Sequence, residues 1–119
     1  MRKTIMVVED DEGIRDIISI LLSEEDYDVK LYPDVGSFKN EIKSMSPDLL
    51  ITDVMLPDGN GLELCSEMRA DNRTDQIPIL MMSANASIND FGSKCTPDDF
   101  IAKPFNIDDF INRVTTILN

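Results

Sequence analysis

The sequence contains no histidine, and its two cysteines, Cys65 and Cys95, lie far apart along the chain. Neither cysteine belongs to a CxxC motif or to a cluster of metal ligands, so the sequence favours neither a disulfide framework nor a zinc site. This sparing use of cysteine is typical of proteins in a reducing cytoplasm, which is the location we expect.

Basic residues are also scarce, with 11 lysines and arginines against 23 acidic residues and a net charge of -12. A field of this sign repels nucleic acid and anionic lipid, so we expect no direct binding to nucleic acid or to a membrane. The apolar run near the N-terminus is only IMVV, with no small-residue cleavage site after it. We therefore expect neither a signal peptide nor a membrane span, which requires about 18 apolar residues or more.

The residues that are present can form a folded core. Hydrophobic residues make up 42% of the 119 residues and charged residues 29%, the ordinary range for a globular protein. The sequence shows no linker, internal repeat or low-complexity segment. A single domain over residues 1–119 is the expectation.

Short apolar runs alternate with segments of helical periodicity. The runs are continuously hydrophobic, which is typical of parallel strands covered on both faces, apart from one alternating run that fits an edge strand. Runs fall at 4–8, 48–52, 77–82 and 100–102, with the edge strand at 28–32. Helical spacing occurs at 14–22, 35–45, 62–68 and 107–118, and Asn106 is placed to cap the last helix. The alternation predicts an α/β three-layer sandwich with right-handed crossovers.

Polar residues follow the strands of this predicted sheet. Glu9, Asp10 and Asp11 come after the first run, and Asp53, Ser83 and Lys103 end later ones. Ligands of such sheets bind at the carboxyl ends of the strands, and clustered carboxylates with room for water suit Mg²⁺. If the strands that precede them are neighbours, Asp10 and Asp53 approach each other. A carboxylate in this setting can act as a nucleophile toward phosphorus.

Each of these residues also has a purely structural explanation. The acids after the first run can start a helix, Asp53 can form a turn with the following PDGNG, and Ser83 can cap a helix. Lys103 is harder to explain in this way, because it lies within the apolar stretch FIAKPF. The combination at one edge of the sheet favours a phosphoryl-transfer site.

Four segments, VVEDDE, ITDVMLPDGNG, MMSA and FIAKPF, resemble the signatures of the receiver domain of two-component response regulators. The resemblance covers essentially the whole chain. It implies a flavodoxin-like (βα)5 fold with a parallel five-stranded sheet in the order 2-1-3-4-5. It also implies Mg²⁺ as cofactor and, as partner, a sensor histidine kinase or a phosphotransfer protein; without histidine, this chain cannot itself carry the phosphohistidine.

The resemblance assigns roles to residues at matching positions. Asp53 is the implied phosphoacceptor, and Asp10, Asp53 and the backbone carbonyl of Met55 are the implied ligands of Mg²⁺. Glu9 is implied to act on the ion through water.

Further matches concern the phosphoryl group and the response to it. Ser83 and Lys103 are implied to bind phosphoryl oxygens, Ala84 is the small residue beside Ser83, and a cis bond is implied before Pro104. Phe100 occupies the position of an aromatic switch; ordinary core packing explains it equally well from the sequence.

The region between Ser83 and Lys103 departs from the family pattern. It lacks the Gly-Ala that typically precedes the last strand, and Gly92 and Pro97 disfavour a helix. We therefore expect a short or poorly ordered fourth helix within 85–97. A charged set resembles the surface that pairs receivers in the winged-helix transcription-factor subfamily, although solvated charge explains it as well. The set consists of Asp98, Asp99, Asp109 and Arg113.

Three functions fit these features to different degrees. The first is a phosphorylation switch that controls an effector or partner in transcription, and pairs with a second copy when phosphorylated. The second is a receiver-like binding module that is never phosphorylated. The third, a magnesium-dependent phosphatase, is disfavoured because such enzymes require an acid two residues after the nucleophile, where this chain has Met55.

Overall fold

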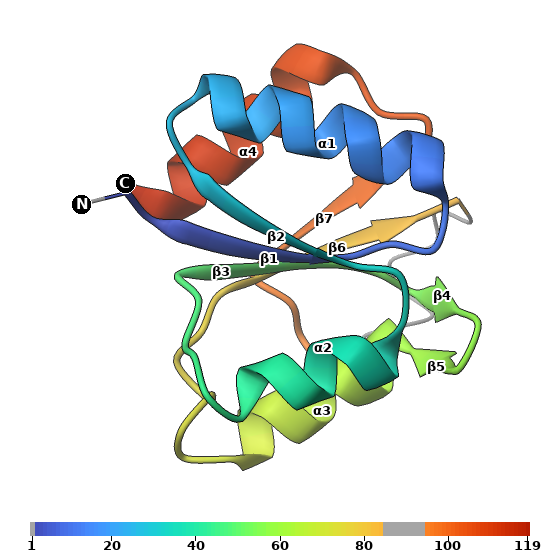
Figure 1. Ribbon diagram of the computed structural model, residues 1–119, viewed down its shortest axis with the longest axis vertical. Helices are drawn as coiled ribbons and strands as arrows, with labels where there is room; N and C mark the ends of the chain where they lie inside the picture. The colour runs from blue at the N-terminus through green and yellow to red at the C-terminus, as the bar shows by residue number, and fades with distance from the viewer. Residues whose placement is uncertain (1, 85–94) are drawn as a thin grey trace.

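The computed structural model of the chain describes residues 2–84 and 95–119, and Figure 1 shows its layers. Up to residue 83, strands of the central sheet alternate with helices along the chain, as the sequence predicts. The elements are β1 (Thr4–Val8), α1 (Glu12–Glu24), β2 (Asp28–Tyr32), α2 (Val35–Ile42), β3 (Leu49–Asp53), β4 (Met55–Leu56), β5 (Gly59–Asn60), α3 (Gly61–Ala70), β6 (Ile79–Ser83), β7 (Asp99–Ala102) and α4 (Ile107–Leu118). The expected short helix falls largely on residues 85–94, which lie outside the described part of the chain.

Five parallel strands form the central sheet in the order β2-β1-β3-β6-β7. Counted along the chain, this is the predicted order 2-1-3-4-5, and the fold class is confirmed. Helices α1 and α4 cover one face of the sheet, whereas α2 and α3 cover the other (Figure 1). The switch in strand order lies between β1 and β3, and this places the end of β3 at the ligand-binding edge typical of such sheets.

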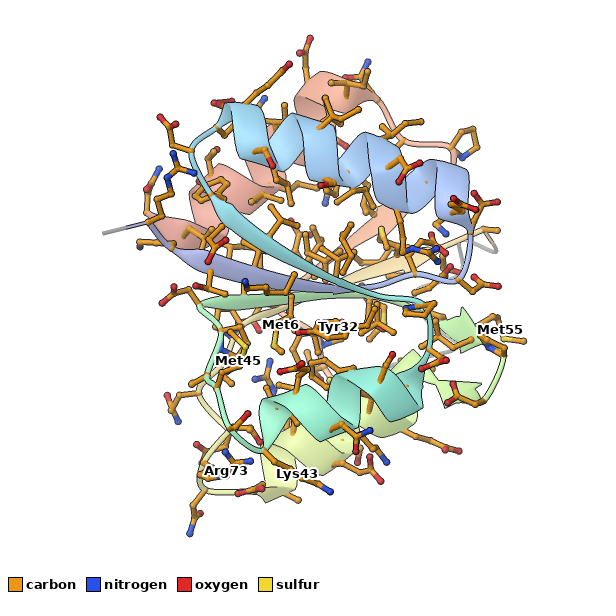
Figure 2. The ribbon with its side chains drawn as sticks, in the orientation of Figure 1. Met6, Tyr32, Lys43, Met45, Met55 and Arg73 are labelled. Atoms are coloured by element: carbon orange, nitrogen blue, oxygen red, sulfur yellow. A yellow bond between two sulfur atoms is a disulfide. The ribbon has the colours of Figure 1, made fainter. Side chains whose placement is uncertain are left out.

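The strands separate two apolar layers, because successive side chains of a strand point to opposite faces. In β1, Ile5 and Val7 face one layer while Met6 and Val8 face the other. We call these the α1/α4 layer and the α2/α3 layer. Figure 2 shows Met6 and Tyr32 together on the α2 side of the sheet.

Helix starts follow the capping chemistry of the sequence. The Asn106 side chain accepts a hydrogen bond from the Asp109 N–H (3.1 Å), which confirms the predicted cap of α4. Asp11 caps α1 by accepting from the Ile14 N–H (3.0 Å). Helix α2 ends at Ile42, so it is shorter than the predicted segment, which reached residue 45.

A small antiparallel hairpin, β4 and β5, occupies the segment in which the sequence predicted only a turn. Its turn residue Asp58 reaches across to the start of α2. The two carboxylate oxygens of Asp58 accept hydrogen bonds from the N–H groups of Val35 (2.8 Å) and Gly36 (2.9 Å). The hairpin that follows Asp53 is therefore fastened to a second helix.

Cys65 and Cys95 form a disulfide, with their Cα atoms 6.0 Å apart. The prediction of no disulfide is wrong for this pair. Thirty positions separate the two residues, and only the fold brings α3 against the chain that leads into β7. Within residues 2–84 and 95–119, no helix has the length and apolar character needed to cross a bilayer.

Candidate functional site

Asp53 is the last residue of β3 and lies at the carboxyl edge of the sheet, with 7% of its surface exposed. Its backbone is fixed by hydrogen bonds on both sides. The Thr52 hydroxyl donates to the Asp53 carbonyl (3.1 Å), and the Val54 N–H donates to the Met82 carbonyl (2.9 Å). The Gly61 N–H then donates to the Val54 carbonyl (2.8 Å). The backbone around Asp53 is therefore held by hydrogen bonds at the end of the strand.

Two further acids meet Asp53, as the sequence predicts. Carboxylate oxygens of Glu9, Asp10 and Asp53 all lie within 4.8 Å of one another. Glu9 has no exposed surface, whereas Asp10 is exposed. Oxygen-only donors with one open side fit a hard divalent cation that keeps part of its hydration shell.

Arg15 positions this acidic loop, a role that the sequence did not predict. Its guanidinium donates to the backbone carbonyls of Glu9 (2.8 Å) and Asp10 (3.1 Å). An arginine one turn into α1 carries no sequence signal for this role, because it contacts backbone rather than an acidic side chain.

Lys103 follows β7 and directs its ammonium toward the acids. Its Nζ atom lies 2.6 Å from Oδ2 of Asp53 and also contacts Oε1 of Glu9. The Lys103 N–H donates to the Ser83 carbonyl (2.8 Å), and the peptide bond to Pro104 is cis, as the resemblance implies. A lysine within an apolar stretch is thus explained by two carboxylate partners.

The buried charges affect one another's proton affinity. Burial raises the pKa of Glu9, and hydrogen bonds from Lys103 and from the Asp11 N–H offset this only in part. Burial alone would lower the pKa of Lys103, but its hydrogen bonds to Asp53 and Glu9 outweigh that effect and raise the pKa. The ammonium therefore stays charged at neutral pH. Two carboxylates share it, so the site favours a further cation.

The remaining predicted residues lie around this cluster. Ser83, buried, ends β6 and pairs in register with Ala102 of β7, while Ala84 beyond it is exposed. Phe100 lies in β7 and packs, half-buried, against the α2/α3 layer. Met55 is 69% exposed, and its side chain projects outward from the hairpin (Figure 2).

The charged set near β7 forms ion pairs within the chain. Arg113 contacts Asp99 (2.8 Å) and Asp109 (3.1 Å). Asp98 pairs with Arg69 of α3 (2.6 Å), a partner that the sequence analysis missed. Pairing of two copies through these residues stays a prediction.

Comparisons with known proteins agree with this geometry. The family model described as "Response regulator receiver domain" matches residues 5–115. A curated relative, "DNA-binding dual master transcriptional regulator RpaA" of Synechocystis, is 35% identical over 116 residues, which cover 96% of this chain and 48% of that protein. The chain thus spans about half the length of this relative.

Two solved structures share the fold at 23% identity. Chemotaxis response regulator CheY4 of Vibrio cholerae aligns with a TM-score of 0.91 over 99% of this chain and 100% of that one. The receiver domain of sensor histidine kinase PA1611 from Pseudomonas aeruginosa, described with a magnesium ion in its active site cleft, aligns with a TM-score of 0.89 over 99% and 98%. On the match over residues 5–115, the chain belongs to the response regulator receiver domain family.

Proposed function

We propose that residues 1–119 form one receiver domain in which Asp53 accepts a phosphoryl group from a histidine kinase or a phosphotransfer protein. The observation that carries the proposal is the convergence on Asp53 of one ammonium and two further carboxylates. The Lys103 ammonium lies 2.6 Å from Asp53, and the three carboxylates lie within 4.8 Å of one another. Such a cluster matches the parts that phosphoryl transfer to a carboxylate requires.

Charge balance supports a magnesium cofactor. Three carboxylates and one ammonium leave two formal negative charges, which one divalent cation would neutralise. Asp10, Asp53 and the Met55 carbonyl would hold the ion directly, and Glu9 would act through water. When bound, Mg²⁺ would neutralise charge on the phosphoryl oxygens.

Three residues of the chain would then each have a role in the phosphoryl transfer. An Asp53 oxygen attacks phosphorus, an O–P bond forms, and the N–P bond to the donor imidazole breaks with its electron pair going to nitrogen. Lys103 exchanges part of its contact with Glu9 for a phosphoryl oxygen, and the Ser83 hydroxyl donates to another. The domain serves as a phosphoacceptor switch whose chemistry is limited to its own phosphorylation and dephosphorylation, and is not an enzyme with a separate substrate.

The response would pass from Ser83 to Phe100. Ser83 and Ala102 are register partners in neighbouring strands, and Phe100 lies two residues before Ala102. Movement of Ser83 toward a phosphoryl oxygen would let the Phe100 ring move further into the α2/α3 layer. The half-buried position of Phe100 supports this role.

The output we propose is control of transcription in the cytoplasm, through an effector or partner protein. The RpaA relative is named as a DNA-binding transcriptional regulator. With a net charge of -12 this domain would not bind DNA directly. Pairing of two phosphorylated copies through Asp98, Asp99, Asp109 and Arg113 would require these residues to exchange their intrachain partners.

Labelling with a small phosphodonor tests the proposal. The chain and its Asp53→Asn variant are incubated with acetyl phosphate, with and without Mg²⁺, and intact mass is measured. We expect one phosphoryl group on the wild type in the presence of Mg²⁺ and none on the variant. Asp48→Asn, which changes an acid at the opposite end of β3, serves as the matched control and should label normally.

Two results would overturn the proposal. Equal labelling of Asp53→Asn would place the phosphoacceptor elsewhere. No labelling of the wild type under any condition would favour a binding module that is never phosphorylated.

A further inference from the structure

The Cys65–Cys95 disulfide joins α3 to the chain that leads into β7. Cys65 has no exposed surface, and Cys95 is 8% exposed. Both residues belong to the α2/α3 layer. The bond therefore fastens together two segments that are distant in sequence.

A second link joins the same two segments without using sulfur. Arg69 lies one turn beyond Cys65 in α3, and Asp98 lies three residues beyond Cys95. The Arg69–Asp98 ion pair measures 2.6 Å, and Asp98 also accepts from the Ile79 N–H (2.8 Å). Because these contacts do not depend on the disulfide, reduced thiols would stay close enough to pair again.

Both linked segments lead directly to the candidate site. Helix α3 begins at Gly61, where any side chain would collide with the Asp53 carbonyl oxygen. Strand β7 ends at Ala102, next to Lys103, whose ammonium contacts Asp53 and Glu9. The disulfide thus lies between the segment that leaves the phosphoacceptor and the segment that delivers the lysine.

We propose that Cys65 and Cys95 form a reversible redox modification site that controls how readily Asp53 is phosphorylated, with a cellular dithiol as the redox partner. The disulfide holds α3 against the start of β7 in the arrangement described above, in which Lys103 is bound to two carboxylates. A phosphoryl group on Asp53 requires Lys103 to shift, and the covalent link opposes that shift. The coupling, but not the redox reaction, rests on the proposed role of Asp53.

The redox reaction is a two-electron thiol–disulfide exchange. A thiolate of the dithiol attacks Sγ of Cys95, since Cys65 has no exposed surface, and the S–S bond breaks with Cys65 leaving as a thiolate that takes up a proton. The second thiol of the dithiol attacks the mixed disulfide and releases Cys95, which is protonated in turn. The dithiol becomes a disulfide and the protein gains two electrons and two protons.

A reversible Cys65–Cys95 disulfide is expected in the cytoplasm, which is the location that we propose. Disulfides in a reducing cytoplasm are rare, and those that occur are usually transient, catalytic or redox-sensing. A permanent structural disulfide is the alternative, and titration decides between the two.

The first experiment measures the redox reaction alone. The purified chain is equilibrated with mixtures of reduced and oxidised dithiothreitol, free thiols are alkylated, and their number is counted by mass. We expect both thiols to appear together in one transition that reverses when the mixture is changed back. A pair that resists reduction in the folded chain, or that does not form again, would overturn the proposal.

The second experiment measures the coupling. Oxidised and reduced wild type are labelled with acetyl phosphate and Mg²⁺, and we expect the reduced form to label at least about fivefold faster, the lower end of typical coupling between sites. The double variant Cys65→Ser/Cys95→Ser should label at the reduced rate in both conditions. If that variant does not fold, Cys95→Ser alone, at the more exposed position, replaces it.

The outcomes separate the coupling from the role of Asp53. Equal labelling rates of the two wild-type forms would overturn the coupling. Absence of labelling in both forms, with the redox transition intact, would overturn the phosphoacceptor role and the coupling together.

Discussion

The two apolar layers lie on opposite faces of one sheet, but they differ in their side chains. Among the residues that the structure describes, the buried part of the α1/α4 layer consists of aliphatic residues with Phe110 and one methionine, Met82. The buried described residues of the α2/α3 layer include three methionines and both cysteines. Methionine side chains adapt to irregular gaps better than branched aliphatic ones do. The layer that contacts Phe100 is therefore the one better able to repack.

The layers also differ in the hydrogen bonds at the ends of their helices. Helices α1 and α4 are capped by the residues just before them, Asp11 and Asn106. Helices α2 and α3 are capped in the same way, by Asp34 and Asn60, but α2 also has long-range contacts at both ends. Asp58 of the hairpin accepts a hydrogen bond at the start of α2, and Arg73, labelled in Figure 2, donates to the Ile42 carbonyl at its end (3.1 Å). A conformational change in the hairpin that follows Asp53 is therefore expected to affect α2 and α3 first, and α1 and α4 later.

Truncation of one buried phenylalanine in each layer should give the largest single effect on stability. Phe38 and Phe110 are both fully buried, and Phe110 stacks on Phe105 with ring centroids 4.8 Å apart. We expect Phe110→Ala to cost about 5 kcal/mol of unfolding free energy and Phe38→Ala about 3, the two ends of the usual range. Urea unfolding under reducing conditions measures both, and an equal or larger cost for Phe38→Ala would contradict the comparison.

Reduction of the disulfide, which lies in the α2/α3 layer, should be the next largest effect. For a separation of 30 residues, loss of the cross-link should lower the free energy of unfolding by about 3 to 4 kcal/mol. A domain of ordinary stability, about 5 to 15 kcal/mol, stays folded after such a loss. Urea unfolding with and without reductant tests this, and the Cys65→Ser/Cys95→Ser variant should not respond to reductant.

Loss of the Asp58 side chain, which accepts hydrogen bonds from α2, should affect more than that helix. We expect Asp58→Ala to cost about 1 to 2 kcal/mol, because it removes acceptors from two N–H groups of α2. Asn106→Ala removes one local acceptor and should cost about 1 kcal/mol. Amide hydrogen exchange distinguishes the two variants, because Asp58→Ala should speed exchange in both α2 and the hairpin. An effect confined to α2 would contradict the proposed link between the hairpin and α2.

The smallest effect concerns the pH dependence of the α2 cap. The Ser37 hydroxyl (2.6 Å) and the Ser37 N–H (2.8 Å) donate to Asp34 and lower its pKa below 3.8. This stabilisation is fully present above pH 3.8 and is lost as pH falls through the folded-state pKa. A carboxyl titration followed by NMR should show the lowered pKa, and Ser37→Ala should move it back toward 3.8.

The elements and their order were predictable because continuous apolar runs and helical spacing persist along this chain. The edge strand β2 alternates in the structure as it does in sequence. The predicted approach of Asp10 to Asp53 also follows from strand order alone. These features depend on local periodicity and on rules of sheet topology.

The features that the sequence did not indicate are contacts of side chains with backbone groups and a contact between two sulfur atoms. Arg15 donates to backbone carbonyls, Asp58 accepts from backbone N–H groups, and Cys65 meets Cys95 across the fold. None of these pairs has a periodic pattern or a fixed spacing. The partners of Asp58 and Cys65 lie 23 and 30 residues away along the chain and become neighbours only in the fold.

Identification of the phosphorylated atom tests the central claim most directly. The chain is labelled with acetyl phosphate and Mg²⁺ and treated with borohydride, which reduces an aspartyl phosphate to homoserine, and the modified residue is located by peptide mass spectrometry. We expect homoserine at position 53 and at no other acid. Homoserine at position 10, or 2-amino-5-hydroxypentanoic acid (the reduction product of a glutamyl phosphate) at position 9, with residue 53 unmodified, would contradict the assignment of Asp53 as the phosphoacceptor.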